Sequence, residues 1–277
     1  MQLTRVNRTE SYCYSPSGLV NIQSRIGTFD ARTREGVVSG GSQFEDLTPN
    51  KHREYGKDAR LSCIVSTGDG CFAVGDRHGG IGLYNDSDKR AKNRFPGFGS
   101  PITSIDATYD GRWILGTTDD CLLLIYTLVK GNPETGGSSK SESLFKKQHM
   151  IGKAATPRVL RLSAADRARC GYAPLQYGHF TLVTEGNSSQ QQERHIVATC
   201  GNAYVVFNLD QVKQELAPAT GKTSSTNCTV HFSNNAYSDV SLLHARYADR
   251  EGNDAIVATT AEGDVATSRI KRTLWNT

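Results

Sequence analysis

The sequence predicts an all-β protein, and three observations carry that prediction. Residues 62–86 (SCIVSTGDGCFAVGDRHGGIGLYND) align without a gap on residues 103–127 (TSIDATYDGRWILGTTDDCLLLIYT), at an offset of 41. Each copy contains an Asp-Gly pair, which favours a tight turn because Gly adopts positive φ readily and Asp tolerates it. Apolar runs of strand length flank each turn. Repeats of roughly 40 residues with three or four strands each are typical of β-propeller blades.

Further copies extend the pattern along most of the chain. Residues 195–209 (HIVATCGNAYVVFNL) place Ala198 82 residues after Gly116, which is twice the offset. Residues 255–270 (AIVATTAEGDVATSRI) place Ala258 a further 60 residues on, and a looser first copy spans residues 12–22. We therefore predict a single propeller domain over residues 1–277 with about four recognisable blades and a partial one. It would be an incomplete or a diverged seven-bladed ring.

A small residue stands in the middle of the second strand of each copy, namely Gly75, Gly116, Ala198 and Ala258. Glycine weakens a strand, so its recurrence there needs a physical reason. The sheets of a propeller pack face to face, and a small side chain lets the neighbouring blade approach. We expect a bulky residue at Gly116 to overpack the core, at a cost of roughly 1–3 kcal/mol.

The third strand of the second copy belongs to a long apolar run, CLLLIYTLV, at residues 121–129. Because the run does not alternate apolar and polar residues, both of its faces should be buried. A blade packed between two others provides that burial. The same run left on a sheet edge would promote aggregation.

Polar segments interrupt the repeats near residues 28–58, 131–143, 186–193 and 217–227, and we expect insertions there. Two short helices are expected besides the strands. Ser163 should cap residues 164–169, and Asn208 or Asp210 should cap residues 211–216.

Composition is that of an ordinary globular protein, with 277 residues, 37% hydrophobic and 22% charged, and a net charge of +4. That excess is too small to indicate nucleic acid by itself. The apolar runs are too short to span a bilayer, and the first residues lack the apolar core of a signal peptide. The expected location is therefore the cytoplasm, where the seven cysteines would be reduced.

Signatures of catalysis, cofactor binding or metal binding are missing from the sequence. The segment GKTSS at residues 221–225 resembles a phosphate-binding loop, but Leu216 stands where the loop needs its first glycine. Neither a Gly-x-Ser-x-Gly nucleophile turn nor a Cys-x-x-Cys pair occurs. We expect Cys63, Cys121 and Cys200 to be small core residues. We expect no catalytic residue, cofactor, metal or small-molecule substrate.

The candidate partner-binding residues are charged and lie at or beside expected turns. They are Lys89, Arg90, Lys92, Arg94, Arg112, Asp119 and Asp120. Loops between blades would bring basic side chains to one rim, where they favour acidic peptides, lipid headgroups or nucleic acid. The simpler interpretation is a solvated surface whose charges pair with nearby acids.

Asp119 and Asp120 also allow two interpretations. A pair of acids suggests catalysis, but that would need a second carboxylate or a base brought in from another blade. Aspartate also belongs in a hairpin turn for backbone reasons, and we favour that role.

Residues 95–125 (FPGFGSPITSIDATYDGRWILGTTDDCLLLI) resemble the C-terminal WD-repeat-like domain of the vacuolar import and degradation 27 family. That family carries a Gly-x-Pro-Ile strand, an Asp-Gly-Arg-Trp turn and a Leu-Leu-Leu-Ile strand in this order. Residues 71–85, 157–168 and 195–209 are also similar to the family, and the resemblance covers roughly residues 11–274. The chain departs from the family at residues 22–25, where Ile-Gln-Ser-Arg replaces Ile-Asp-Pro-Arg.

The resemblance implies a cytoplasmic WD-repeat-like propeller associated with vacuolar import and degradation of proteins, with no reaction attached to it. Family domains begin earlier, with blades that are not recognisable before Ser11. Three functions stay open. The chain could be a non-catalytic scaffold or adaptor for protein partners, an enzyme with a site in the central channel, or a basic surface for anionic lipid or RNA. The lack of catalytic signatures favours the scaffold, because rigid blades present many loops for binding.

Overall fold

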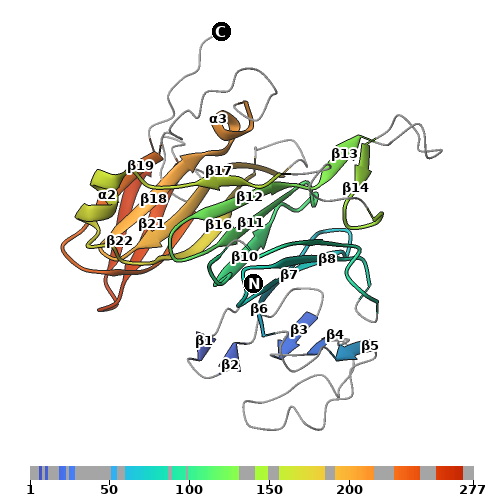
Figure 1. Ribbon diagram of the computed structural model, residues 1–277. Coiled ribbons are helices and arrows are strands. Elements are labelled where there is room, and N and C mark those ends of the chain that lie inside the picture. The colour runs from blue at the N-terminus through green and yellow to red at the C-terminus, as the bar shows by residue number, and fades with distance from the viewer. Residues whose placement is uncertain are drawn as a thin grey trace, which may run out of the picture. The chain divides into compact units, whose positions relative to one another are not determined.

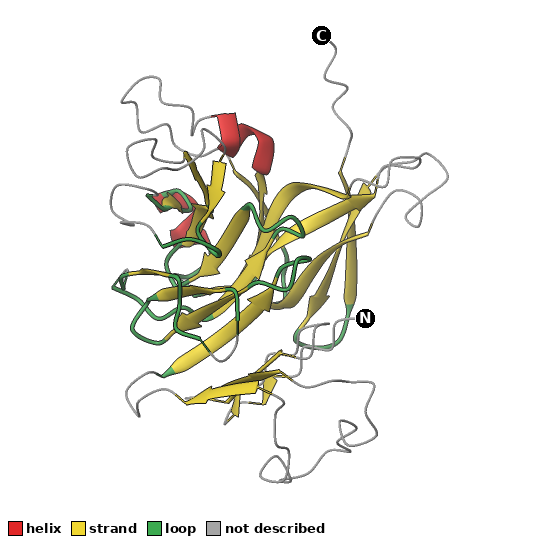
Figure 2. Ribbon diagram, turned by 90° about the vertical axis from the view of Figure 1, so that its right-hand side faces the viewer, coloured by secondary structure: helices red, strands yellow, loops and turns green. Residues whose placement is uncertain are grey.

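The computed structural model describes residues 6–7, 10–11, 19–22, 25–28, 51–54, 60–86, 89–97, 99–130, 141–148, 156–184, 191–214, 228–243 and 254–270. Strands far outweigh helices in these ranges (Figure 1, Figure 2). The described helices are α2 (Ala164–Arg169) and α3 (Leu209–Gln214). The prediction of an all-β protein is therefore confirmed.

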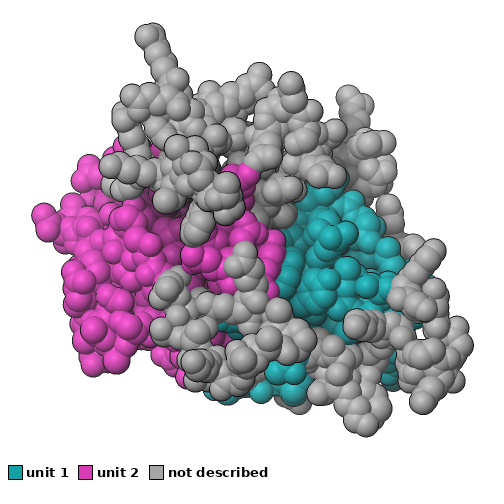
Figure 3. All heavy atoms as spheres, turned by 90° about the horizontal axis from the view of Figure 1, so that it is seen from above, with its two compact units in different colours: residues 1–118, 123–158 teal, residues 119–122, 159–277 magenta. Residues whose placement is uncertain are grey.

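The chain divides into two compact units, which Figure 3 shows in different colours. Unit 1 comprises residues 1–118 and 123–158, and unit 2 comprises residues 119–122 and 159–277. The single propeller domain over residues 1–277 stays a prediction.

Unit 1 contains a four-stranded antiparallel sheet whose strands follow chain order. Its strands are β6 (Leu61–Ser66), β7 (Phe72–Asp76), β8 (Ile81–Tyr84) and β9 (Asn93–Phe95). A three-stranded antiparallel sheet precedes it, formed by β3 (Leu19–Ile22), β4 (Arg25–Thr28) and β5 (Lys51–Glu54). Two hairpins accompany these sheets, formed by β1 (Val6–Asn7) with β2 (Glu10–Ser11) and by β13 (Leu128–Lys130) with β14 (Ser141–Ser143).

The next sheet has the strand order β10-β11-β12-β15. Its strands are β10 (Ser104–Ala107), β11 (Trp113–Thr117), β12 (Leu122–Tyr126) and β15 (Arg158–Leu160). Ile105 lies opposite Gly116 in this sheet, much as Cys63 lies opposite Gly75 in the preceding one. The repeat in the sequence is thus a repeat of strand pairing.

Unit 2 contains two further antiparallel sheets in chain order. The first comprises β16 (Leu175–Thr184), β17 (Gln191–Cys200), β18 (Ala203–Asn208) and β19 (Cys228–Phe232). The second comprises β20 (Tyr237–Leu243), β21 (Asp254–Thr260) and β22 (Val265–Ile270). Sheets of three or four strands joined in sequence order have the construction of propeller blades.

The small residues occupy equivalent places, as predicted. Gly75, Gly116, Ala198 and Ala258 are all buried, and each lies in the second strand of its sheet. A Cβ added at Gly116 would lie 3.0 Å from Ile81 Cδ1, which belongs to β8 of the preceding sheet. Close approach of a neighbouring sheet therefore explains the glycine.

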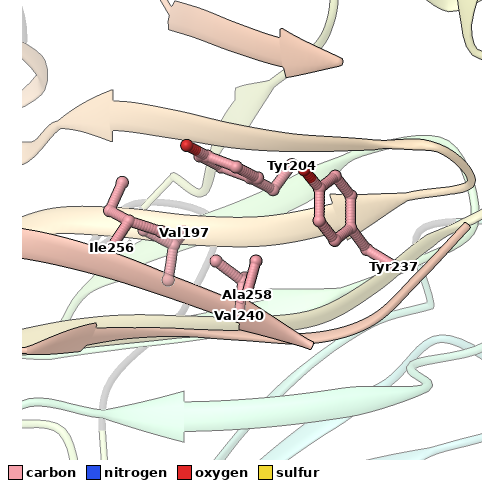
Figure 4. Close-up of a cluster of buried hydrophobic side chains, with 6 residues drawn as sticks. All are labelled: Val197, Tyr204, Tyr237, Val240, Ile256 and Ala258. Atoms are coloured by element: carbon pink, nitrogen blue, oxygen red, sulfur yellow. The ribbon is translucent and has the colours of Figure 1, made fainter. Parts of the chain in front are cut away.

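The two sheets of unit 2 share an apolar cluster, shown in Figure 4. The Tyr204 ring of β18 meets the Tyr237 ring of β20 edge-on, with 5.4 Å between centroids. Ala258 of β21 is fully buried in the same cluster. The other members are Val197, Val240 and Ile256.

Strand β12 is buried on both faces along Leu122–Ile125, with 0–1% of each residue exposed. The prediction drawn from the apolar run 121–129 is confirmed for these four residues, whereas Tyr126 at the end of β12 is exposed and Leu128 is only partly buried. Trp113, in the adjacent strand, is only partly buried and packs against the exposed Tyr126, with 4.7 Å between ring centroids.

The first expected helix is present with its predicted bounds, and the second, α3, begins at Leu209, two residues before the predicted start at residue 211. Ser163 caps α2, because its Oγ accepts a hydrogen bond from the Asp166 backbone N–H at 3.1 Å. Asn208 plays that role before α3, where its Oδ1 accepts from the N–H groups of Asp210 and Gln211.

Most residues of the expected insertions lie outside the described ranges. Where the ranges overlap them, residues 28, 51–54, 141–143 and 191–193 are parts of the strands β4, β5, β14 and β17. Residues 217–227 lie entirely outside.

Candidate functional site

The first Asp-Gly turn joins β6 to β7 and is held by its own side chains. Thr67 Oγ1 donates to Asp69 Oδ1 at 2.7 Å, and the same carboxylate oxygen accepts the Cys71 backbone N–H at 3.3 Å. Gly70 N–H donates to the Thr67 carbonyl at 3.1 Å, and Gly70 has a φ of +80°. Glycine is needed there because other residues adopt this conformation at a cost.

The second Asp-Gly turn joins β10 to β11 and repeats this arrangement. Thr108 Oγ1 donates to Asp110 Oδ1 at 2.7 Å, and the Arg112 N–H donates to the same oxygen at 2.9 Å. Gly111 N–H donates to the Thr108 carbonyl at 2.9 Å, and Gly111 has a φ of +67°.

The two turns contact each other within unit 1. Gly68 N–H donates to the Tyr109 carbonyl at 2.8 Å. A Cβ added at Gly68 would lie 2.6 Å from the Tyr109 ring, so the ring rests directly on the Gly68 backbone. Tyr109 nevertheless remains 65% exposed. The turn pair therefore presents an aromatic ring to solvent on a fixed backbone.

The segment after β14 closes the same region. Leu144 N–H donates to the Thr127 carbonyl at 2.9 Å, and Thr127 Oγ1 donates to the Gly111 carbonyl at 2.5 Å. The side-chain amide of Asn93 donates to the carbonyls of Leu144 and Lys147. We call the residues 67–71, 108–112, 126–127 and 144–147 the Asp-Gly turn surface.

An ion pair joins two parts of this surface. Lys146 Nζ lies 2.8 Å from Asp69 Oδ2. Partial burial by itself would raise the pKa of Asp69, but hydrogen bonds from Lys146 and Thr67 outweigh it and lower that pKa to about 2. The hydrogen bond to Asp69 likewise raises the pKa of Lys146.

The predicted basic residues are placed as follows. The segment with Lys89, Arg90 and Lys92 joins β8 to β9, at the end of the sheet where the first Asp-Gly turn joins β6 to β7. Arg112 is exposed and belongs to the Asp-Gly turn surface. Arg94 differs, because its side chain reaches Asp76 at the other end of β7, with 2.6 Å between Nη2 and Oδ2.

Several of these charges are paired within unit 1, as the simpler interpretation predicted. Lys89 lies 3.0 Å from Asp86, and Arg112 Nε lies 3.2 Å from Asp110. Lys147 pairs with Glu142 of β14. The net charge that the Asp-Gly turn surface offers to an anion is therefore small, which weakens the lipid and RNA alternatives.

Asp119 and Asp120 belong to unit 2, where α2 holds their turn. Arg167 donates to Asp120 Oδ1 at 2.9 Å and to the Asp119 carbonyl at 3.1 Å. Leu175 N–H donates to the same carbonyl at 2.9 Å. These contacts involve the main-chain carbonyl of Asp119 and the side chain of Asp120. The backbone role favoured for the two acids, like partner binding by them, stays a prediction.

Four residues of this surface are not among the predicted partner-binding residues, namely Tyr109, Tyr126, Asp69 and Lys146. The repeat holds a signal for Tyr109, since the offset of 41 aligns it with Gly68, the residue that its ring covers. Nothing in the sequence pairs Lys146 with Asp69, which precedes it by 77 residues.

Comparison with known protein families shows the family to which this chain belongs. Residues 41–228 match the family described as the VID27 C-terminal WD40-like domain. The chain belongs to this family. The resemblance drawn from residues 95–125 is therefore confirmed.

Two curated relatives of this VID27-family chain are named vacuolar import and degradation protein 27. The Schizosaccharomyces pombe protein is 26% identical over 168 residues, covering 61% of this chain and 20% of the relative. The Saccharomyces cerevisiae protein is 25% identical over 193 residues, covering 65% of this chain and 24% of the relative. The chain thus spans about a fifth to a quarter of their length.

Two solved structures are similar to this VID27-family chain over almost its whole length. Two crystal structures of BBS1N in complex with ARL6DN, soaked with lead and with mercury, match with TM-scores of 0.54 and 0.50. Their identities are 10% and 12%, and each match covers 96% of this chain and 65% of the other. At such identities the likeness shows the fold alone. The match to the WD40-like family confirms the predicted WD-repeat-like propeller class.

Five of the six cysteines that the structure describes are buried, and Cys228 is partly buried. Cys63, Cys121 and Cys200 are buried, as predicted for core residues. Burial, together with the nearby Asp69 charge, raises the pKa of Cys71 to about 11. Burial and the neighbouring Cys200 raise the pKa of Cys170 to about 12. These two thiols stay protonated at neutral pH and are poor nucleophiles.

Among the residues that the structure describes, no group of three or more His, Cys, Asp or Glu side chains is placed to hold a metal ion. Within those same ranges, no helix has both the length and the apolar character that crossing a membrane requires.

Proposed function

We propose that this chain is a non-catalytic propeller scaffold or adaptor that binds protein partners in the cytoplasm and serves vacuolar import and degradation of proteins. Family membership and the names of the two yeast relatives support the link to that process. The BBS1N structures, which contain a protein complex, support partner binding in general.

The composition of the Asp-Gly turn surface is the main structural support for this proposal. It presents the exposed rings of Tyr109 and Tyr126. The same surface contains the ion pairs of Asp69 with Lys146 and of Asp110 with Arg112. Tyrosine is favoured in protein interfaces because a large, stiff ring buries much area at low entropic cost. Protein interfaces commonly combine aromatic residues at their centre with polar and charged residues at their rim.

A comparison of variants in a co-purification experiment tests the proposal. The purified chain and its Tyr109→Ala plus Tyr126→Ala variant would each be incubated with cytosol from the source cells, and bound proteins quantified by mass spectrometry. We expect at least one protein to be retained by the parent chain and reduced at least fivefold on the variant. Tyr172→Ala is the matched control, since Tyr172 is 70% exposed and lies in unit 2.

Thermal melting of each variant separates loss of binding from loss of folding. The double variant Lys89→Glu with Arg90→Glu extends the test to the predicted basic residues, which lie at the same end of the sheet as the first Asp-Gly turn. An identical set of captured proteins for the parent chain and for both double variants would contradict the proposal. Turnover in a broad substrate screen would favour the enzyme alternative instead.

A further inference from the structure

A second surface lies at the other end of β7, away from the Asp-Gly turn surface. Here the turn of residues 77–80 joins β7 to β8, and Arg60 immediately precedes β6. The Arg77 N–H donates to the Arg60 carbonyl at 2.9 Å, so the backbone pairing of β6 with β7 continues one residue beyond this end of the two strands. The Arg94 guanidinium reaches the same end from β9 through Asp76.

Asp76 makes this end rigid. Its side chain is 5% exposed, and Oδ1 accepts the N–H groups of His78 at 2.9 Å and Gly80 at 2.8 Å. Oδ2 binds Arg94 at 2.6 Å. Its backbone carbonyl accepts the N–H of Gly79 at 3.1 Å and that of Ile102 at 3.0 Å. Asp76, a single buried residue, thus holds the turn of residues 77–80, the side chain of Arg94 and the segment that leads into β10.

Two glycines complete the rigid end. A Cβ at Gly80 would lie 2.7 Å from Asp76 Oδ2 and 3.2 Å from Arg94 Nη2, so the glycine leaves room for this ion pair. A Cβ at Gly97 would lie 2.3 Å from the His78 carbonyl oxygen, so the chain after β9 packs directly on the turn. Groups held on such a frame lose little conformational freedom when they bind a ligand.

The charge at this end is unbalanced. Arg60, Arg77 and Arg94 are all exposed, whereas Asp76 is the buried partner of Arg94 alone. Arg60 and Arg77 form no ion pair with a carboxylate in the part of the chain that the structure describes. Lys89, Arg112, Lys146 and Lys147 each have an acidic partner in the same unit.

Arg60 also has a strained backbone. Its φ is +41°, in the left-handed region that residues other than glycine rarely adopt. Such strain is energetically costly and concentrates at functional sites. Glycine would suit this backbone better, so the presence of an exposed arginine needs a reason beyond folding.

We propose that Arg60, Arg77 and Arg94 form a binding site for an acidic peptide segment of a partner protein. Guanidinium groups bind carboxylates through paired hydrogen bonds, which suits a short run of Asp or Glu side chains. Nucleic acid fits less well, because it needs many phosphate contacts and stacking rings. The described residues offer three guanidiniums here, and the ring of Phe95 at the end of β9 is buried. This site goes beyond the proposed function, which concerns the Asp-Gly turn surface.

Fluorescence anisotropy with a fluorescein-labelled decapeptide of alternating Glu and Ser tests the site on the full chain. We expect saturable binding at 50 mM salt that weakens at least fivefold at 200 mM salt. The variant Arg60→Gln with Arg77→Gln should bind the peptide at least tenfold more weakly. Arg112→Gln is the matched control, since Arg112 is similarly exposed but paired with Asp110, and it should change binding less than twofold.

Arg60→Gly separates charge from folding. It removes the charge and relieves the positive φ, so we expect a higher melting temperature together with weaker peptide binding. Absence of saturable binding by the parent chain, or equal losses for Arg112→Gln and the double variant, would overturn the proposal. Tighter binding of a single-stranded RNA of equal charge would also overturn it. The Tyr109→Ala plus Tyr126→Ala variant should bind the peptide normally, so failure here is distinct from failure of the proposed function.

Discussion

The two successive blades that begin at β6 and at β10 each contain an Asp-Gly turn of the same kind. They differ in how closely neighbouring residues pack against that turn. The hydrogen bond from threonine to aspartate is 2.7 Å in both Asp-Gly turns. A Cβ added at Gly70 would meet nothing within 4 Å, whereas one added at Gly111 would lie 3.2 Å from Thr67 Cγ2. Local sequence therefore determines the turn, and the neighbouring blade determines how much change the turn tolerates.

The same contrast is stronger at the mid-strand glycines. A Cβ at Gly75 would lie 2.6 Å from Cys63 Sγ and 2.7 Å from Ile102 Cγ2. A Cβ at Gly116 would press only on the end of Ile81, at 3.0 Å, and would lie at ordinary contact distance from Leu123 and Ile102. Two residues that align in the sequence thus face different packing constraints, because one meets side-chain atoms close to their backbones and the other meets the terminal methyl group of Ile81.

The largest expected effect is the difference between Gly75→Ala and Gly116→Ala. Gly75→Ala should lower the free energy of unfolding by about 2–3 kcal/mol, since Ile102 and Cys63 have no room to move aside. Gly116→Ala should cost about 1 kcal/mol or less, because a change of rotamer at Ile81 makes space. Urea denaturation of both variants measures the difference.

The double variant Gly75→Ala with Cys63→Ala is the control for that comparison. Removing the sulfur that clashes should make the double variant less destabilised than the two single costs added together. Equal costs at the two glycines, or a larger cost at Gly116, would show that packing in the two blades is alike.

A smaller effect is expected at the two turn glycines. Gly70→Ala should cost about 1 kcal/mol for the positive φ alone. Gly111→Ala should cost about 1–2 kcal/mol, because its Cβ also presses on Thr67. Asparagine tolerates positive φ, so Gly70→Asn should recover part of the loss and Gly111→Asn should not. Equal behaviour of the two turns in thermal denaturation would contradict this ordering.

The sequence was sufficient for features that depend on residues close together in the chain. The Asp-Gly turns follow from the preference of Asp and Gly for turn geometry, and the helix caps at Ser163 and Asn208 follow from short polar side chains. The burial of β12 follows from its unbroken apolar run. The offset of 41 then placed Gly75 and Gly116 in equivalent strands.

Features that join distant residues could not be predicted in this way. Arg94 was assigned to the basic loop with Lys89, but its side chain crosses the sheet to Asp76. The pairing of Lys146 with Asp69 depends on how the hairpin of β13 and β14 returns to the turn. No local pattern encodes either contact, because each requires the positions of whole strands.

The smallest expected effect concerns the pH dependence of one of these distant contacts. The pKa of Asp69 is about 2 in the folded chain, below its ordinary value of 3.8. A lowered pKa in the folded state stabilises the fold above the ordinary pKa, and that contribution is lost as pH falls toward the folded value. Because the Asp69 side chain is about half exposed, solvent screening limits the contribution to roughly 1 kcal/mol.

Asp69→Asn should therefore lower the free energy of unfolding by about 1 kcal/mol at pH 7, and the difference from the parent chain should shrink between about pH 5 and pH 2. Lys146→Gln is the matched control, since it removes the ion pair but keeps the hydrogen bond from Thr67, and it should show about half the effect. Urea denaturation at pH 7, 4 and 2.5 measures both. A difference that stayed constant or grew as the pH fell would mean that Lys146 does not hold the Asp69 carboxylate. The aspartates of the two Asp-Gly turns would then be alike in their charge interactions as well as in the geometry of their turns.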